Sequence, residues 1–163
     1  NNLSAFSVSL WYHPIDTTRD GGAYEVLLSR GDIKQCPDRH GEWSISLFDC
    51  RQAVFGHNNS VWSSFSGMGL TCQEIINSQT GKWIHVVAVQ NNGTYQIYQD
   101  GQLKNSASGN VVGCIPALQP SQDQGDLLLG VDYKGKIDDV FIYNRALSAA
   151  EVQTLFLADA CCE

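Results

Sequence analysis

Two adjacent carboxylates, Asp138 and Asp139, lie within a segment that is otherwise typical of a buried strand. Residues 136–143 read KIDDVFIY, and strict period-two alternation places Asp138 on the face of Val140 and Asp139 on the opposite face. One acid should therefore point toward the core, where an ionised carboxylate needs a cation or several hydrogen-bond donors. The alternative is that the aspartates accept backbone N–H groups or pair with Arg145.

A second group of chemically capable residues surrounds Trp62. In the segment GHNNSVWSSF, this aromatic side chain stands near the imidazole of His57 and the amides of Asn58 and Asn59. An exposed aromatic ring can stack on a sugar ring, and neighbouring amides can hydrogen-bond its hydroxyl groups. The same tryptophan could instead close its loop over the body of the domain. The residues leave both interpretations open.

The six cysteines predict disulfide bonds rather than a metal centre. No pair has the C-x-x-C spacing of zinc and redox motifs, although zinc bound by scattered cysteines is left open. An even number of scattered cysteines is typical of an oxidising compartment, so we expect a secreted or cell-surface protein. Cys50 and Cys72 flank one long loop and are the pair that we expect to be bonded. The other candidates are Cys36, Cys114 and the adjacent Cys161 and Cys162, which could tie down the end of the chain.

The composition is that of one folded domain that is poorly suited to polyanions. The chain has 163 residues, 43% of them hydrophobic, and a formal net charge of -7. Its basic residues form no cluster, which argues against nucleic acid and anionic membrane surfaces as partners. No leader sequence and no bilayer-spanning apolar run occur. We expect a single domain over residues 1–163, excised from a larger extracellular protein.

Short alternating segments predict an antiparallel sandwich. AFSVSLWY and EWSISLFD are two of them, and the dipeptide Asp100-Gly101 is a hairpin-turn signal between two others. Near the C-terminus, Ser148 stands three residues before Glu151, which is the spacing of a helix capping box. The expected fold class is therefore all-β, a two-sheet antiparallel jelly roll with one short C-terminal helix.

Three segments resemble the strand signatures of a known family. FSVSLWYHP, GKWIHVVAVQNNGTYQIYQDGQL and YKGKIDDVFIYNRALSAAEVQTLF are similar to those of the laminin G-like branch of the concanavalin A-like lectin/glucanase superfamily. The last is the most specific, because G-x-I-D-D-V-x-I-Y-N-R-A-L-S is matched from Gly135 to Ser148. The resemblance covers residues 6–156 and implies two antiparallel sheets of about six or seven strands each.

The resemblance also implies a role for the two aspartates. Family members often hold a calcium ion near the sandwich edge, using an aspartate of this segment, backbone carbonyls and acids from elsewhere. Calcium suits such a site because it takes about six to eight oxygen ligands in irregular geometry. We therefore expect a structural calcium ion, with Asp138 as the preferred ligand and Asp139 beside it.

The motifs favour recognition over catalysis. Glucanases of this superfamily carry carboxylates at alternate positions of one strand. No such array, no G-x-S-x-G motif and no phosphate-binding loop occur here. We expect a non-catalytic extracellular module that binds carbohydrate, with the Trp62 loop as its site. The alternative is a module that binds an extracellular protein in cell adhesion or spaces the domains of a cell-surface protein; insertion into a membrane is not expected.

Overall fold

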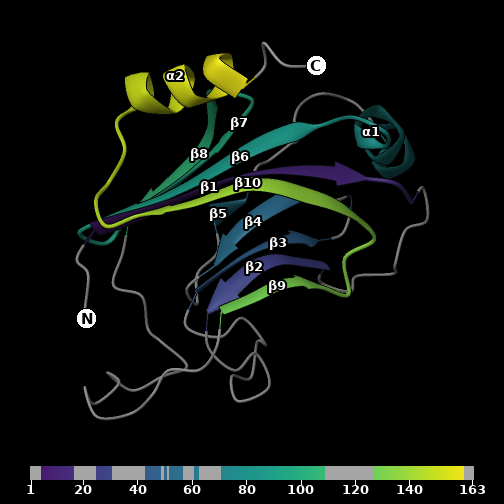
Figure 1. The fold of residues 1–163 in the computed structure, drawn as a ribbon, viewed down its shortest axis with the longest axis horizontal. Helices are drawn as coiled ribbons and strands as arrows, with labels where there is room; N and C mark the ends of the chain where they lie inside the picture. Colours follow the sequence, from purple (N-terminus) through teal and green to yellow (C-terminus); the bar gives the residue numbers. More distant parts are fainter. Residues whose placement is uncertain are drawn as a thin grey trace.

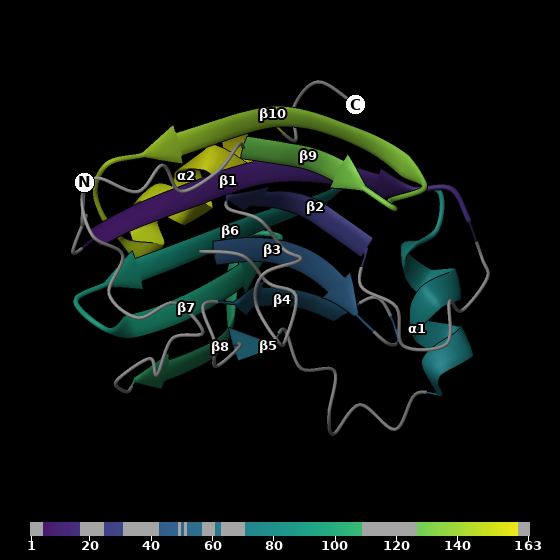
Figure 2. The same ribbon diagram turned by 90° about the horizontal axis from the view of Figure 1, so that it is seen from below.

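The chain folds into two stacked antiparallel sheets, each with five strands among the described residues. The computed structural model describes residues 5–16, 25–30, 43–48, 50, 52–56, 61–62, 71–108 and 127–159. Figures 1 and 2 show the sheets lying face to face, with the two helices outside them. The predicted all-β sandwich is therefore confirmed.

One sheet, called sheet A, has the strand order β10-β1-β6-β7-β8. All its neighbouring strands run antiparallel. The first described strand of the chain thus lies between the last strand and a three-strand meander. The members of sheet A are β1 (Ala5–Pro14), β6 (Ile84–Asn91), β7 (Thr94–Gln99), β8 (Gln102–Ser108) and β10 (Gly135–Tyr143).

The other sheet, called sheet B, has the order β5-β4-β3-β2-β9. Its edge strand β9 is followed in the chain by β10, so the turn over residues 132–134 carries the chain from one sheet to the other. The members of sheet B are β2 (Glu25–Arg30), β3 (Trp43–Phe48), β4 (Gln52–Gly56), β5 (Val61–Trp62) and β9 (Leu127–Val131).

Two-residue turns close the meander of sheet A. Asp100 and Gly101 both have positive φ, 51° and 73°, as a type I′ hairpin turn requires. Asn92 and Gly93 form the same kind of turn, with φ values of 48° and 83°. The hairpin predicted at Asp100-Gly101 is confirmed, and its geometry fixes the register of β7 against β8.

The core lies between the sheets and is filled from alternate strand positions. Val8 of β1 and Ile45 of β3 have no solvent exposure, and Leu47 has only 1%. The rings of Phe6 and Phe55 meet edge to face across the core, with centroids 6.0 Å apart. Burial of these side chains is the main force that joins the sheets.

The predicted C-terminal helix is α2 (Ala149–Asp159). It lies over the outer face of sheet A (Figure 1), where Val152 is buried with Val87 of β6. The predicted capping box is present, because the Ser148 N–H donates to the Glu151 carboxylate at 2.8 Å and the Glu151 N–H donates to Ser148 Oγ at 3.3 Å. This cap starts the helix directly after the strand β10 and its short connection.

A second helix, α1 (Cys72–Gln79), was not anticipated from the sequence. It lies beyond the strand ends of the sandwich, away from α2 (Figures 1 and 2). Ile75 and Ile76 are buried. The available signal was Thr71 three residues before Glu74, the same capping-box spacing as in α2. With only 8 residues, the helix is too short to show a clear apolar stripe.

Candidate functional site

The two adjacent aspartates lie on a β-bulge of β10. The pairing with β1 advances two residues from Ser9 to Trp11 but three residues from Phe141 back to Asp138, so β10 carries one extra residue. Within it, Asp139 has a φ of 47°, in the left-handed region. Aspartate tolerates this conformation better than most residues other than glycine.

The bulge makes the predicted facing of the aspartates wrong. Ile137 and Val140 contact the core, whereas Asp138 and Asp139 are both exposed. The extra residue shifts the alternation by one position, so neither carboxylate turns inward. Asp138 Oδ1 accepts the Asp139 N–H at 2.9 Å, whereas Arg145 pairs with Glu151 at 2.7 Å. A buried charge in need of compensation is therefore not the reason for these acids.

The described residues supply only part of a calcium site at this bulge. Within the described ranges, no group of three or more His, Cys, Asp or Glu side chains could hold a metal ion. Asp138 and Asp139 offer carboxylate oxygens at the surface, and calcium takes about six to eight oxygen ligands. The remaining ligands would have to be backbone carbonyls, water or groups outside the described ranges. Calcium stays a prediction.

Of the four residues predicted to bind sugar, the structure describes only the backbone of Trp62. This residue lies on β5, opposite Val54 of β4, at the edge of sheet B. The side chain of Trp62 and the whole of His57, Asn58 and Asn59 lie outside the described residues. Sugar binding by this loop therefore also stays a prediction.

The predicted pair Cys50–Cys72 forms a disulfide bond. The bond joins the turn after β3 to the first residue of α1, and the two Cα atoms are 4.9 Å apart. It fixes the helix to sheet B. It also closes a covalent loop of the chain that contains β4 and β5. The other candidates, Cys36, Cys114, Cys161 and Cys162, lie outside the described residues.

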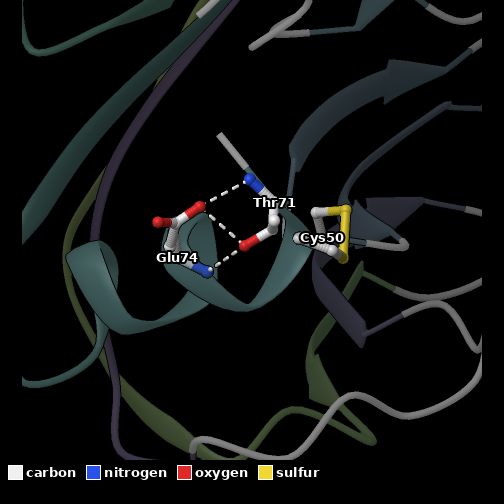
Figure 3. The surroundings of a disulfide bond; sticks show 4 residues. Cys50, Thr71 and Glu74 are labelled. Atoms are coloured by element: carbon white, nitrogen blue, oxygen red, sulfur yellow. Dashed lines mark hydrogen bonds between the residues drawn. A yellow bond between two sulfur atoms is a disulfide. The ribbon is translucent and has the colours of Figure 1, made fainter. Parts of the chain in front are cut away.

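A capping box lies directly beside this disulfide (Figure 3). The Thr71 N–H donates to the Glu74 carboxylate at 2.7 Å, and the Glu74 N–H donates to Thr71 Oγ1 at 3.3 Å. Hydrogen bonds from the Thr71 side chain and backbone lower the pKa of Glu74. The start of α1 is thus held both by a covalent bond and by a charged cap.

A buried polar group lies under α2. Ser9 Oγ and the ring atom His85 Nε2 are 2.8 Å apart. The backbone N–H of His85 donates to Asp100 Oδ1 at 3.1 Å. Burial raises the pKa of Asp100. A serine hydroxyl beside an imidazole can act as a nucleophile where substrate reaches it. Here Ser9 is 3% and His85 0% exposed, so the pair is enclosed and serves to join β1 to β6.

The outer face of sheet A carries a row of aromatic rings that α2 covers only in part. Trp11 and His85 stack with centroids 4.9 Å apart, and Phe156 of α2 stacks on Trp11 at 5.9 Å. The next pair along the strands, His13 and Trp83, has centroids 5.2 Å apart. Trp11 and His85 are buried, whereas His13 and Trp83 are partly exposed.

Charged side chains flank the exposed end of this row. The pairing of β1 with β10 places Lys136 opposite His13, and Asp138 opposite Trp11. Residues paired in this way project from the same face of a sheet. Lys136 and Asp138 are both exposed. An aromatic surface, an ammonium group and a carboxylate thus lie together, an arrangement that no local sequence motif indicated.

Residues 1–153 match the Laminin_G_3 family, described as the concanavalin A-like lectin/glucanases superfamily. The chain belongs to this family. A comparison with curated proteins finds no matching sequence for this laminin G-like domain. Within the described residues, none of the helices has the length and apolar character needed to cross a membrane.

Solved structures similar to this laminin G-like domain belong to larger proteins. Domain 4 of the arabinanase AbnA from Geobacillus stearothermophilus is 22% identical, with a TM-score of 0.56 over 93% of this chain and 66% of that one. The Trypanosoma rangeli sialidase is 21% identical, with a TM-score of 0.61 over 96% and 23%. The binding domain of botulinum neurotoxin DC is 17% identical, with a TM-score of 0.59 over 96% and 36%. The domain thus spans less than two thirds of each chain, and at these identities the likeness shows the fold alone.

Proposed function

We propose that this laminin G-like domain is a non-catalytic module that binds carbohydrate. The observation that carries the proposal is the match of residues 1–153 to the concanavalin A-like lectin/glucanases superfamily. Two proteins of similar fold support it: AbnA domain 4 was solved in complex with arabinotriose, and the neurotoxin DC binding domain in complex with SialylT. The fold is thus compatible with sugar binding, and the side chains must supply the specificity.

The arrangement of the acids supports a role without catalysis. Glycoside hydrolysis uses two carboxyl groups that face one cleft from opposite sides of the scissile bond. Asp138 and Asp139 instead lie next to each other on an exposed bulge. The Ser9–His85 pair is closed to substrate.

In this proposal the domain acts outside the cell or at its surface and holds a structural calcium ion. The Cys50–Cys72 disulfide supports the extracellular setting, because such bonds persist mainly in oxidising compartments. The exposed carboxylates of Asp138 and Asp139 support a cation at the edge of sheet A. The ion would join β10 to a neighbouring part of the chain.

A broad glycan array, probed in calcium and again in EDTA, tests this function. We expect binding to a limited set of glycans, and Trp62→Ala tests whether the β5 loop contributes. Binding that survives EDTA would keep the lectin and remove calcium from the proposal. A folded protein that binds no glycan in calcium contradicts the proposed function.

A protein partner is the second candidate, and exposed apolar side chains favour it. Leu127 and Leu129 on β9 are 52% and 56% exposed, and Phe141 and Ile142 on β10 are 47% and 49% exposed. These are the edge strands of the two sheets, and exposed apolar residues at an edge are typical of association. This alternative would be favoured if the array shows no glycan binding and a protein ligand binds the Leu129→Asp variant more weakly than the unchanged domain.

A further inference from the structure

We infer that the exposed end of the aromatic row on sheet A binds a neutral sugar. We call it the outer-face site and define it by four residues: His13, Trp83, Lys136 and Asp138. The inference rests on the proposed carbohydrate binding, and it gives that function a place among the described residues and a class of ligand. It is separate from Trp62, which lies on β5 at the edge of the other sheet.

The aromatic part of the site is held rigidly from one side. His13 and Trp83 contact each other with ring planes at 60°. Next to them, the rings of Trp11, His85 and Phe156 contact one another, with centroids 4.9 to 6.1 Å apart, and Trp11 and His85 are buried. Because the exposed pair borders a packed cluster, its rings lose little freedom when a ligand stacks on them. The apolar face of a sugar ring suits such a surface.

The polar part of the site lies on β10. Lys136 and Asp138 are two residues apart on one face of the strand, which separates their Cα atoms by about 7 Å. An ammonium group donates hydrogen bonds and a carboxylate accepts them. Sugar hydroxyl groups do both, so one donor and one acceptor beside an aromatic surface can fix a sugar ring in one orientation.

The charges around the site have no positive excess, which favours a neutral sugar over an acidic one. Lys134 donates to Asp16 at 3.2 Å at the same end of β1 and β10. Together with Lys136, Asp138 and the adjacent exposed Asp139, this gives two positive and three negative groups. An acidic sugar would gain from the lysines and lose through the exposed Asp138 carboxylate. The adjoining chain adds one further charge of each sign, Lys82 and Asp132.

The described helices leave this end of sheet A open to a ligand. Figures 1 and 2 show α2 over the half of sheet A that includes the Ala5 end of β1. The opposite end, where β1 reaches Pro14 and β10 begins at Gly135, extends beyond α2. The other helix, α1, lies past the strand ends rather than over the sheet.

Titration of the ¹⁵N-labelled domain tests the site. The probes are the strongest neutral glycan from the array and 3′-sialyllactose as an acidic comparison, both in EDTA so that calcium does not contribute. We expect the neutral glycan to shift the indole N–H signal of Trp83. Lys136→Met and Asp138→Asn should each weaken binding by about 10-fold or more, the usual effect of losing a hydrogen bond to a charged group.

The variants distinguish loss of the sugar site from loss of the fold and from loss of calcium binding. Lys136 is exposed, so its replacement should leave the fold intact, and an ammonium group cannot bind calcium. Lys104→Met is the matched control, because Lys104 is exposed on β8 at the far edge of the same sheet. Its affinity for the glycan should equal that of the unchanged domain.

Three results would overturn the inference, and only one of them would also contradict the proposed function. Glycan binding that is equally tight in Lys136→Met and Asp138→Asn removes the outer-face site and leaves the proposed function standing. Tighter binding of 3′-sialyllactose than of the neutral glycan would contradict the inference that the ligand is a neutral sugar. A folded domain that binds no glycan at all removes both the site and the proposed function.

Discussion

Asp139 adopts a left-handed backbone, with a φ of 47°, inside the edge strand of sheet A. An edge strand presents unpaired backbone groups, with which another extended chain can pair. The bulge interrupts that row of groups, and the exposed carboxylates of Asp138 and Asp139 add charge beside it. At the scale of single residues, the bulge and the two carboxylates thus disfavour the pairing of β10 with another extended chain.

Replacing Asp139 tests the bulge. Asp139→Val should lower the free energy of unfolding by about 1–2 kcal/mol, because a β-branched side chain is strained at positive φ. Asp139→Gly should be nearly neutral, since glycine adopts this conformation freely. Asp138→Val is the control for loss of charge at an exposed position of the same strand. Urea denaturation that gives equal effects for valine at positions 138 and 139 would contradict the left-handed conformation.

Asp100 is a residue whose charge costs stability in the folded state. Burial raises its pKa above the ordinary value of 3.8, so protonation favours the folded state. The stability that protonated Asp100 contributes is present below about pH 4 and is lost as the pH rises through the folded-state pKa. Asp100→Asn removes this loss, keeps an acceptor for the His85 N–H and forms the preferred Asn-Gly turn.

We expect Asp100→Asn to raise the free energy of unfolding at pH 7 by about 0.5 kcal/mol, a modest value because solvent screens the turn. At pH 3 the variant and the unchanged domain should be equally stable. Asp100→Ala, which loses the acceptor, should be destabilised at both pH values. Thermal unfolding at pH 3 and pH 7 measures these stabilities. An Asp100→Asn variant that is less stable than the unchanged domain at pH 7 would contradict the predicted stabilisation.

At the scale of elements, α1 depends on what holds its first residue. The Cys50–Cys72 bond spans a sequence separation of 22. Chain-entropy arguments give about 3 kcal/mol for a loop of this length. The charged cap of Thr71 and Glu74 contributes about 1 kcal/mol more. The disulfide should therefore be the larger of the two supports.

Removal of the disulfide is the corresponding prediction. The double variant Cys50→Ser/Cys72→Ser should lose about 3 kcal/mol of unfolding free energy in urea, and Thr71→Ala about 1 kcal/mol. If both losses act on α1, hydrogen exchange should increase first at Ile75 and Ile76, whose side chains are buried. A double variant as stable as the unchanged domain would show that the bond does not constrain the chain.

The start of α2 depends on a charge that acid removes. Hydrogen bonds from Arg145 and Ser148 lower the pKa of Glu151 to about 2. The stabilisation is therefore present above its unfolded value of about 4.5 and is lost as the pH falls toward about 2. Glu151→Gln should speed amide exchange in α2 at pH 7, and the difference should vanish near pH 2. A difference that persists there would assign the effect to side-chain shape rather than charge.

At the scale of the whole molecule, calcium binding has a stability consequence. A ligand that binds only the folded state stabilises it by about 2.7 kcal/mol at 100 times its Kd. If calcium is held at the bulge, it should raise the Tm, and Asp138→Asn with Asp139→Asn should abolish that rise. Asp132→Asn, in the exposed turn before β10, is the control. An equal rise in the double variant would place the ion elsewhere.

The sequence predicted the parts of the molecule that follow a regular period. Alternation in the segment AFSVSLWY puts Phe6, Val8 and Leu10 on one face, and in the structure all three belong to the core, because no bulge interrupts β1 itself. The same rule failed at Asp138, because the bulge appears only in the pairing with β1. The outer-face site could not be predicted, since His13 and Trp83 are far apart in sequence and meet only because the neighbouring residues Tyr12 and Ile84 pair between β1 and β6.

The pairing of β1 with β10 also sets the order in which the molecule can form. Ser7 pairs with Tyr143, and Ser7 Oγ donates to the Arg145 carbonyl and accepts the Leu147 N–H, each at 2.9 Å, across 138 and 140 residues of sequence. Contacts this distant close large loops and make folding slow. During synthesis, β1 must wait for almost the whole domain to emerge before that side of it is covered. Until then the backbone groups along that edge of β1 can pair with another chain, so misassembly is the main risk while the domain forms.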